Sequence, residues 1–72
     1  MLKNHLAQAE GHVSIGDEII ARQRRLIFRL DRDGHDSTEA RGLLGLFEDV
    51  QKMHEADRDR LLKEFRELSA SS

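Results

Sequence analysis

The sequence predicts an all-α fold in which two long helices, joined by one tight turn, form an antiparallel, coiled-coil-like hairpin. Apolar residues recur at steps of three and four, the chain has no proline, and a helix-stop signal next to a helix-start signal lies near its middle. We therefore expect one helical-hairpin domain over residues 1–72, with helix one at about 2–33, a turn at about 34–36 and helix two at about 37–69.

Helix one is predicted from two interleaved series of residues, each with a period of seven. One series is Leu6, Val13, Ile20 and Ile27, and the other is Leu2, Ala9, Gly16, Gln23 and Leu30. This heptad pattern places both series on one face of the helix. Each interior glycine costs about 1 kcal/mol relative to alanine. A break between Gly11 and Gly16 is therefore an alternative to one continuous helix.

The turn is predicted at Asp33-Gly34-His35-Asp36. A glycine just past a helix end accepts the left-handed conformation that closes the last turn. Asp36 then offers a side-chain oxygen to the next helix, with Glu39 completing a capping box, and Ser37 is an equally suitable cap. Because the stop and start signals are adjacent, the connection is short and the two helices should run antiparallel.

Helix two is predicted from apolar residues that flank a strongly polar middle. The residues expected to face helix one are Leu43, Phe47, Val50, His54, Leu61, Phe65 and Leu68. They fit an eleven-residue spacing about as well as a seven-residue one. Folding the chain at the turn pairs positions whose numbers sum to roughly 70. In that register Ile20 meets Val50, and His54 lies opposite Gly16.

The apolar residues spread over more of each helix than one partner helix can cover. The candidate interface residues are Ile15, Ile19, Leu26, Phe28, Leu46, Met53 and Leu62. Fully burying a residue of this size is worth about 1.5–3 kcal/mol, so leaving several in water forgoes much of the stability of a small domain. We expect a homo-oligomer, preferably a dimer that forms a four-helix bundle. Singly exposed apolar residues are the alternative.

The composition argues against several functional classes. The chain has no cysteine, and therefore no disulfide or thiolate metal site, and its net charge of −2 offers no general attraction to nucleic acid or anionic lipid. The segment Met1–His5 lacks the apolar core of a signal peptide, and no apolar run approaches the roughly 20 residues that span a bilayer. These features predict a cytoplasmic protein without membrane contact.

No arrangement of residues predicts catalysis, so we expect no enzyme, no cofactor and no metal. His5 and His12 are seven residues apart, whereas metal ligands on one helix are usually three or four apart. His54 and Asp57 have a suitable spacing, but helix one supplies no matching carboxylate–histidine pair. His35 is expected to be a solvated turn residue. A histidine-based metal-binding bundle is therefore the least favoured alternative.

A row of arginines on one face of helix one is the only candidate anion contact. Its members are Arg22, Arg25, Arg29 and Arg32. Such a row can neutralise phosphates, but carboxylates surround it and no aromatic residues interleave to stack on bases. We expect a solvated or salt-bridged face, which makes a nucleic-acid accessory protein the alternative function. The favoured function is a small interaction or structural module that engages copies of itself or an unidentified protein partner.

Several strings, read together, resemble a group of small uncharacterised bacterial helical proteins. They are His5-Leu6-Ala7-Gln8-Ala9-Glu10, Ile20-Ala21-Arg22-Gln23-Arg24, Asp33-Gly34-His35-Asp36, Phe47-Glu48, and His54 followed by Asp57-Arg58-Asp59-Arg60-Leu61. The turn string is the most specific of them. The resemblance implies a helical hairpin of bacterial origin with no assigned activity, and it carries over no catalytic residues.

Overall fold

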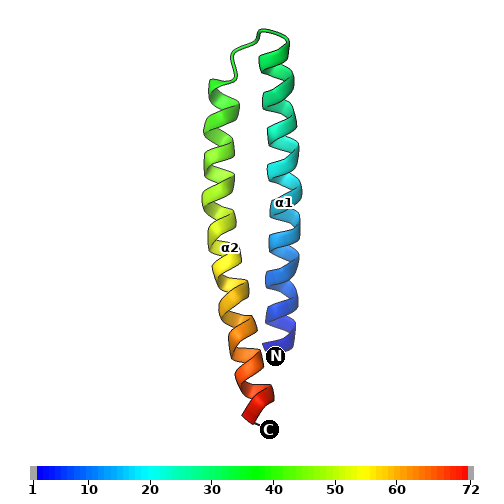
Figure 1. Ribbon diagram of the computed structural model, residues 1–72, viewed down its shortest axis with the longest axis vertical. Coiled ribbons are helices and arrows are strands. Elements are labelled where there is room, and N and C mark those ends of the chain that lie inside the picture. The colour runs from blue at the N-terminus through cyan, green and yellow to red at the C-terminus, as the bar shows by residue number, and fades with distance from the viewer. Residues whose placement is uncertain (1, 72) are drawn as a thin grey trace.

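Two long helices that pack side by side form the computed structural model, which describes residues 2–71. Helix α1 covers Leu2–Arg32 and helix α2 covers Thr38–Ser71. The chain reverses between them and returns alongside α1, so the start of α1 and the end of α2 lie at one end of a 59 × 15 × 14 Å rod (Figure 1). The predicted all-α hairpin is confirmed. Helix α1 also continues through Gly11 and Gly16 without a break.

Gly34, two residues past the end of α1, closes the helix in the way the sequence predicts. Gly34 has a φ angle of +76°, in the left-handed region. The His35 N–H donates to the Leu30 carbonyl at 2.8 Å, and the Gly34 N–H donates to the Asp31 carbonyl at 3.2 Å. These bonds make a Schellman motif, which satisfies carbonyls that the helix end would otherwise leave unpaired. Glycine suits this position because any side chain in this conformation costs about 1–2 kcal/mol.

The start of α2 differs from the predicted capping box between Asp36 and Glu39. The N–H and the hydroxyl of Thr38 both donate to Asp36 Oδ1, at 3.0 and 2.6 Å, which makes an Asx turn. The Ser37 carbonyl accepts a hydrogen bond from the Arg41 N–H at 2.9 Å. Ser37 is therefore the N-cap residue by its backbone, although its side chain serves another purpose.

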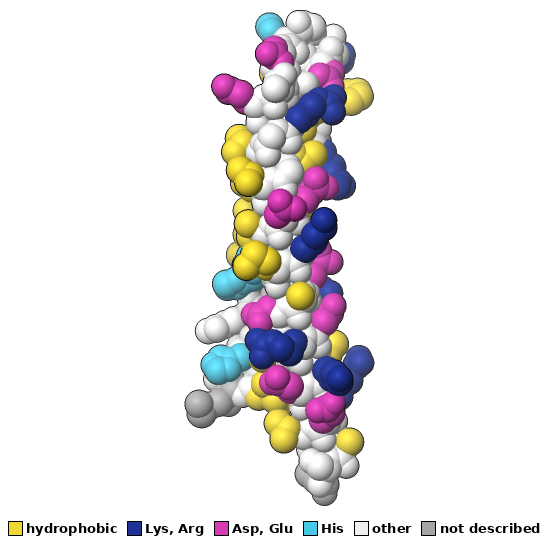
Figure 2. All heavy atoms as spheres, turned by 90° about the vertical axis from the view of Figure 1, so that its left-hand side faces the viewer, with side chains coloured by type: hydrophobic (Ala, Val, Ile, Leu, Met, Phe, Trp, Pro, Cys, Tyr) yellow, Lys and Arg dark blue, Asp and Glu magenta, His cyan; other side chains and the backbone are white. Residues whose placement is uncertain are grey.

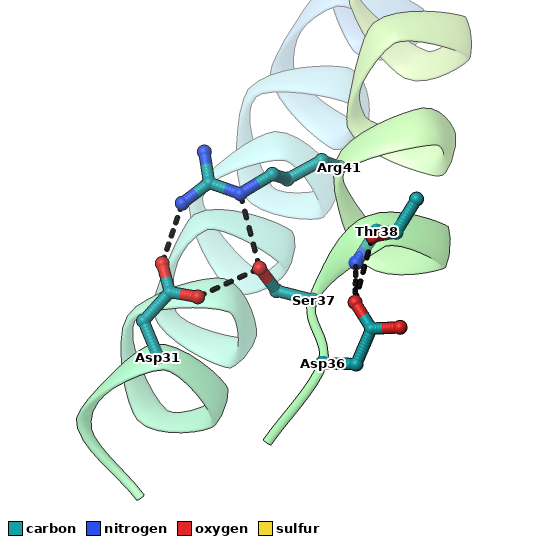
Figure 3. A network of polar contacts seen from close by, with 5 residues as sticks. All are labelled: Asp31, Asp36, Ser37, Thr38 and Arg41. Carbon is teal, nitrogen blue, oxygen red and sulfur yellow. Dashed lines mark hydrogen bonds and ion pairs between the residues drawn. The ribbon is translucent and has the colours of Figure 1, made fainter. Parts of the chain in front are cut away.

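That side chain belongs to a polar network that joins the end of α1 to the start of α2 (Figure 3). The Ser37 hydroxyl donates to Asp31 Oδ1 at 2.6 Å and accepts from Arg41 Nε at 3.0 Å, while Arg41 Nη2 pairs with Asp31 Oδ2. The Ser37 hydrogen bond is the main reason that the pKa of Asp31 is lowered, and Arg41 adds to it against the opposing effect of desolvation. Hydrogen bonds from the Thr38 hydroxyl and backbone lower the pKa of Asp36.

The seam between the helices follows heptads on both sides. In α1, every member of the two predicted series is buried or half-buried. In α2, the seam residues are Ala40, Leu44, Phe47, Gln51, His54, Arg58, Leu61 and Phe65, at alternating steps of four and three. The predicted seam residues Leu43 and Val50 lie outside this series and are 46% and 49% exposed. Leu68 continues the series but lies near the open end of the hairpin and is 61% exposed. The seven-residue spacing, rather than the eleven-residue one, therefore describes α2.

The core along this seam is thin. Within residues 2–71, the buried apolar residues are Leu6, Ala9, Val13, Ile27, Ala40 and Leu61, and no described side chain is less than 2% exposed. Leu6, Ala9 and Leu61 form one cluster near the open end, covered by Leu2, Leu62 and Phe65. A helix pair with so small a core is marginally stable by itself.

A buried glutamine interrupts the apolar seam. Gln51 is 4% exposed, and its Nε2 donates to the Val13 carbonyl at 2.9 Å and to Asp17 Oδ1 at 2.8 Å. Its Oε1 is buried and has no hydrogen-bond partner among the described residues. A β-carbon added at Gly16 would lie 1.8 Å from this oxygen. Gln51, rather than the predicted His54, therefore fills the space over Gly16.

We expect acid to weaken the connection between the helices. The pKa values of Asp31 and Asp36 are lower in the folded chain than their ordinary values. Their stabilisation is therefore complete above the unfolded-state pKa of about 4 and is lost as the pH falls through the lower folded-state values. The free energy of unfolding, measured by urea denaturation, should fall below about pH 4.

The fall should be shallower in an Asp31→Asn/Asp36→Asn variant and unchanged in Asp49→Asn, an exposed control. Equal slopes in the double variant and the native chain would contradict this interpretation.

Alanine at Gly16 and alanine at Gly11 should have opposite effects on stability. At Gly16 the new β-carbon meets Gln51, which could move away only by giving up its two hydrogen bonds, whereas at Gly11 nothing lies within 4 Å. We expect Gly16→Ala to lower the free energy of unfolding by about 1–3 kcal/mol. Gly11→Ala should raise it by up to about 1 kcal/mol.

A double-mutant cycle identifies the cause of the Gly16 effect. Gln51→Ala removes the obstacle, so adding Gly16→Ala to that variant should no longer destabilise the chain. If Gly16→Ala alone proved as stabilising as Gly11→Ala, the close packing of Gln51 on Gly16 would be refuted.

Candidate protein-interaction site

The seam leaves two long edges on the hairpin, and these edges have opposite character. Ion pairs cross between the helices along one of them, where Arg24 Nη2 lies 3.2 Å from Glu48 Oε2 and Arg41 pairs with Asp31. Large hydrophobic side chains occupy the other, which we call the apolar edge. Its members are Ile15, Ile19 and Leu26 of α1 and Leu43, Leu46, Val50 and Met53 of α2.

Helical spacing brings these residues together. Within each helix they are three, four or seven residues apart, so each set forms one stripe. The two stripes meet, because Ile15 and Ile19 line the same groove as Phe47 and Val50. Figure 2 shows hydrophobic side chains gathered along one side of the rod, beside a column of mixed charges.

The groove in the apolar edge has a volume of about 420 Å³. Gly16 and the buried Gln51 lie at its base, and His12 and His54 line it towards the open end of the hairpin. The rest of its lining is apolar. The neighbouring side chains are well exposed, with fractions of 59% for Ile15, 61% for Leu46 and 71% for Met53. A contiguous apolar surface of this kind is typical of an interaction site.

Five of the seven candidate interface residues lie on the apolar edge, and two lie elsewhere. Leu62 is half-buried and packs against the cluster of Leu6, Ala9 and Leu61. Phe28 is 67% exposed and lines a hollow formed by arginines. Sequence reasoning missed Leu43 and Val50 because it placed them in the seam. If the α2 heptads are counted strictly, with the polar residues Gln51 and Arg58 as seam positions, Leu43 and Val50 lie on the apolar edge.

The arginine row is only partly ion-paired. Arg32 Nε lies 3.2 Å from Asp33 Oδ1, while Arg22, Arg25 and Arg29 form no ion pair within residues 2–71. These three, together with Arg24, surround the exposed ring of Phe28. An aromatic side chain therefore stands inside the row, contrary to the sequence analysis.

Two histidines from different helices meet across the seam. The ring centroids of His12 and His54 are 5.1 Å apart and the ring planes cross at 75°. Both also line a second hollow with His5, Asp57 and Arg60. Arg60 binds the Asp57 carboxylate, which is the main reason that the pKa of Arg60 is raised. His35 is exposed in the turn.

Within residues 2–71, the fold adds no third ligand to the spacings His5–His12 and His54–Asp57, which the sequence offers as the least favoured alternative. Over the described part of the chain, no group of three or more His, Cys, Asp or Glu side chains is arranged to hold a metal ion. Neither described helix is long and apolar enough to cross a membrane. Comparison with family models, curated proteins and solved structures finds no match for this chain.

Proposed function

We propose that this chain is a self-associating helical hairpin whose apolar edge docks against the same edge of a second copy. In the proposed dimer the helices of each hairpin run antiparallel, and the two hairpins make a four-helix bundle. The protein would then act as a structural or protein–protein interaction module, with no catalysis. The observation that carries the proposal is that, within residues 2–71, seven of the nine exposed large hydrophobic side chains lie on one edge.

Energetics favour covering this edge. Its seven side chains are between 37% and 71% exposed, so burying them would contribute roughly 1 kcal/mol each. In the described part of the hairpin only six apolar residues are buried. The apolar area left in water is therefore large compared with the core, and docking of a second copy would couple association to folding.

The dimensions of the rod suit an interface of ordinary size. One long side of the 59 × 15 Å rod projects an area of roughly 900 Å², and a dimer that used all of it would approach the 800 Å² that each partner contributes to a standard interface. The apolar edge itself spans about 17 Å of that length. The seven residues of the apolar edge carry no charge, whereas Arg22, three residues from Ile19 and four from Leu26, lies in the same stripe of α1. The opposite edge, where Arg24 already pairs with Glu48 and Arg41 with Asp31, lacks this apolar surface.

The proposed setting is the bacterial cytoplasm. The resemblance to small bacterial helical proteins supports a bacterial origin. The absence of cysteine from the sequence suits a reducing compartment, where disulfides do not form.

Sedimentation equilibrium tests the self-association. We expect the native chain to have twice its monomer mass of 8.3 kDa, and Leu46→Glu to weaken the dimer at least tenfold, because a carboxylate would be buried without a partner. Leu68→Glu is the matched control, since Leu68 is also 61% exposed but lies outside the apolar edge. It should leave the dimer intact. A fully helical native chain that stays at 8.3 kDa at high concentration would defeat the proposal.

A second candidate function is that of a nucleic-acid accessory protein, and the surroundings of Phe28 favour it. An exposed ring among the unpaired Arg22, Arg25 and Arg29 combines a stacking surface with groups that neutralise phosphates. The net charge of −2 weighs against this candidate, because the rest of the chain would repel a polyanion. It therefore ranks below self-association.

Fluorescence anisotropy with a labelled single-stranded oligonucleotide at low salt tests this second candidate. Binding should weaken steeply as salt is added and should be lost in Arg25→Glu/Arg29→Glu. Phe28→Ala should weaken it by roughly 5–100-fold, as expected for one lost stacking contact. Arg66→Glu, an exposed change on α2, should have a much smaller effect. Absence of binding to the native chain at low salt would rule this function out.

A further inference from the structure

We infer that His12 and His54 form a two-histidine site for a divalent transition-metal ion such as Zn²⁺, bridging the two helices. Two imidazoles that share one tetrahedral zinc, with Zn–N bonds of about 2.0–2.1 Å, have ring centres roughly 5 Å apart. The ring centroids of His12 and His54 are 5.1 Å apart in an edge-to-face pair, so the separation suits one shared ion, and turning the rings about their side-chain bonds would aim one nitrogen of each at it. The inference concerns a single chain and does not depend on the proposed dimer.

The fold positions both rings through regular backbone. His12 belongs to α1 and His54 to α2, and His54 is half-buried at a seam position. Groups held on packed helices are placed more accurately than groups on loops. The rings also lie between two hollows, of about 420 and 280 Å³, which leaves room for an ion and its water ligands.

The charged and titratable neighbours are compatible with a cation. His5, Asp57 and Arg60 line the same hollow as the two rings. The charge of Arg60 is offset by its ion pairs with Asp57 and Glu64. His5 and Asp57 could support the metal-bound water by hydrogen bonds, as outer groups commonly do at metal sites.

The ligand set also predicts which ions bind. Imidazole nitrogen suits Zn²⁺, Ni²⁺ and Cu²⁺, whereas Mg²⁺ requires oxygen ligands. Two protein ligands leave the other coordination positions to water, so the ion should exchange readily, unlike zinc in a closed four-ligand structural site. Protons compete for the same nitrogens, and acid should therefore weaken binding.

Thermal unfolding of tag-free protein, followed by circular dichroism, tests the site. Addition of zinc chloride should raise the Tm of the native chain, whereas magnesium chloride should not. His12→Gln and His54→Gln should each abolish the zinc-dependent rise. His35→Gln, in the exposed turn, is the matched control and should keep it. Isothermal titration should give one Zn²⁺ per chain.

A measurement on the native chain keeps the test decisive if a variant fails to fold. In NMR spectra, substoichiometric Zn²⁺ should perturb the ring resonances of His12 and His54 before those of His35. A native Tm that does not respond to zinc would overturn the inference. So would a zinc response that survives in both His12→Gln and His54→Gln, or NMR changes that begin at His35.

Discussion

Each helix of this hairpin has one intramolecular neighbour, and most features of the molecule follow from that constraint. One neighbour covers one heptad stripe, so Leu6, Val13 and Ile27 of α1 are buried while Ile15 and Ile19 are not. The uncovered apolar side chains lie on one edge, whereas ion pairs such as Arg24–Glu48 hold the other. The uneven distribution of apolar surface, more than its amount, makes that edge a candidate for docking.

Features that depend on local sequence were predictable. The heptads of α1 predict every residue of the face that packs on α2, because contacts with one neighbouring helix recur at the heptad spacing. Gly34 marks the end of α1, since its left-handed conformation excludes most other residues. The exact cap of α2 was not predictable, because Asp36, Ser37 and Thr38 all offer oxygens and tertiary contacts decide between them. The Ser37 hydroxyl donates to Asp31 of α1 and accepts from the Arg41 side chain, instead of accepting a backbone N–H of its own helix.

Features that depend on the register between the helices were less predictable. Hydrophobicity alone places Val50 in the seam and leaves Gln51 outside it, but the structure reverses the two. Gln51 tolerates burial only because Val13 and Asp17 accept its amide hydrogens, and those acceptors belong to the other helix. The meeting of His12 with His54 has the same origin. No sequence pattern relates His12 to His54, so their contact can be predicted only when the register between the helices is known.

The contact between Gln51 and Gly16 adds to the short turn between the helices in favouring one register. Two apolar heptad stripes pack almost equally well after one helix is shifted along the other by seven residues. Apolar contacts alone therefore define poorly which residues of the two helices face each other. A polar residue at one seam position can fix it at a cost in stability. Here the cost is visible in the unpaired Gln51 Oε1. A slide by seven residues would carry Gln51 from Gly16 to Ala9 or Gln23, where a β-carbon occupies the space that its side chain needs. The apolar edge and the histidine pair both depend on the register that the turn and this contact share.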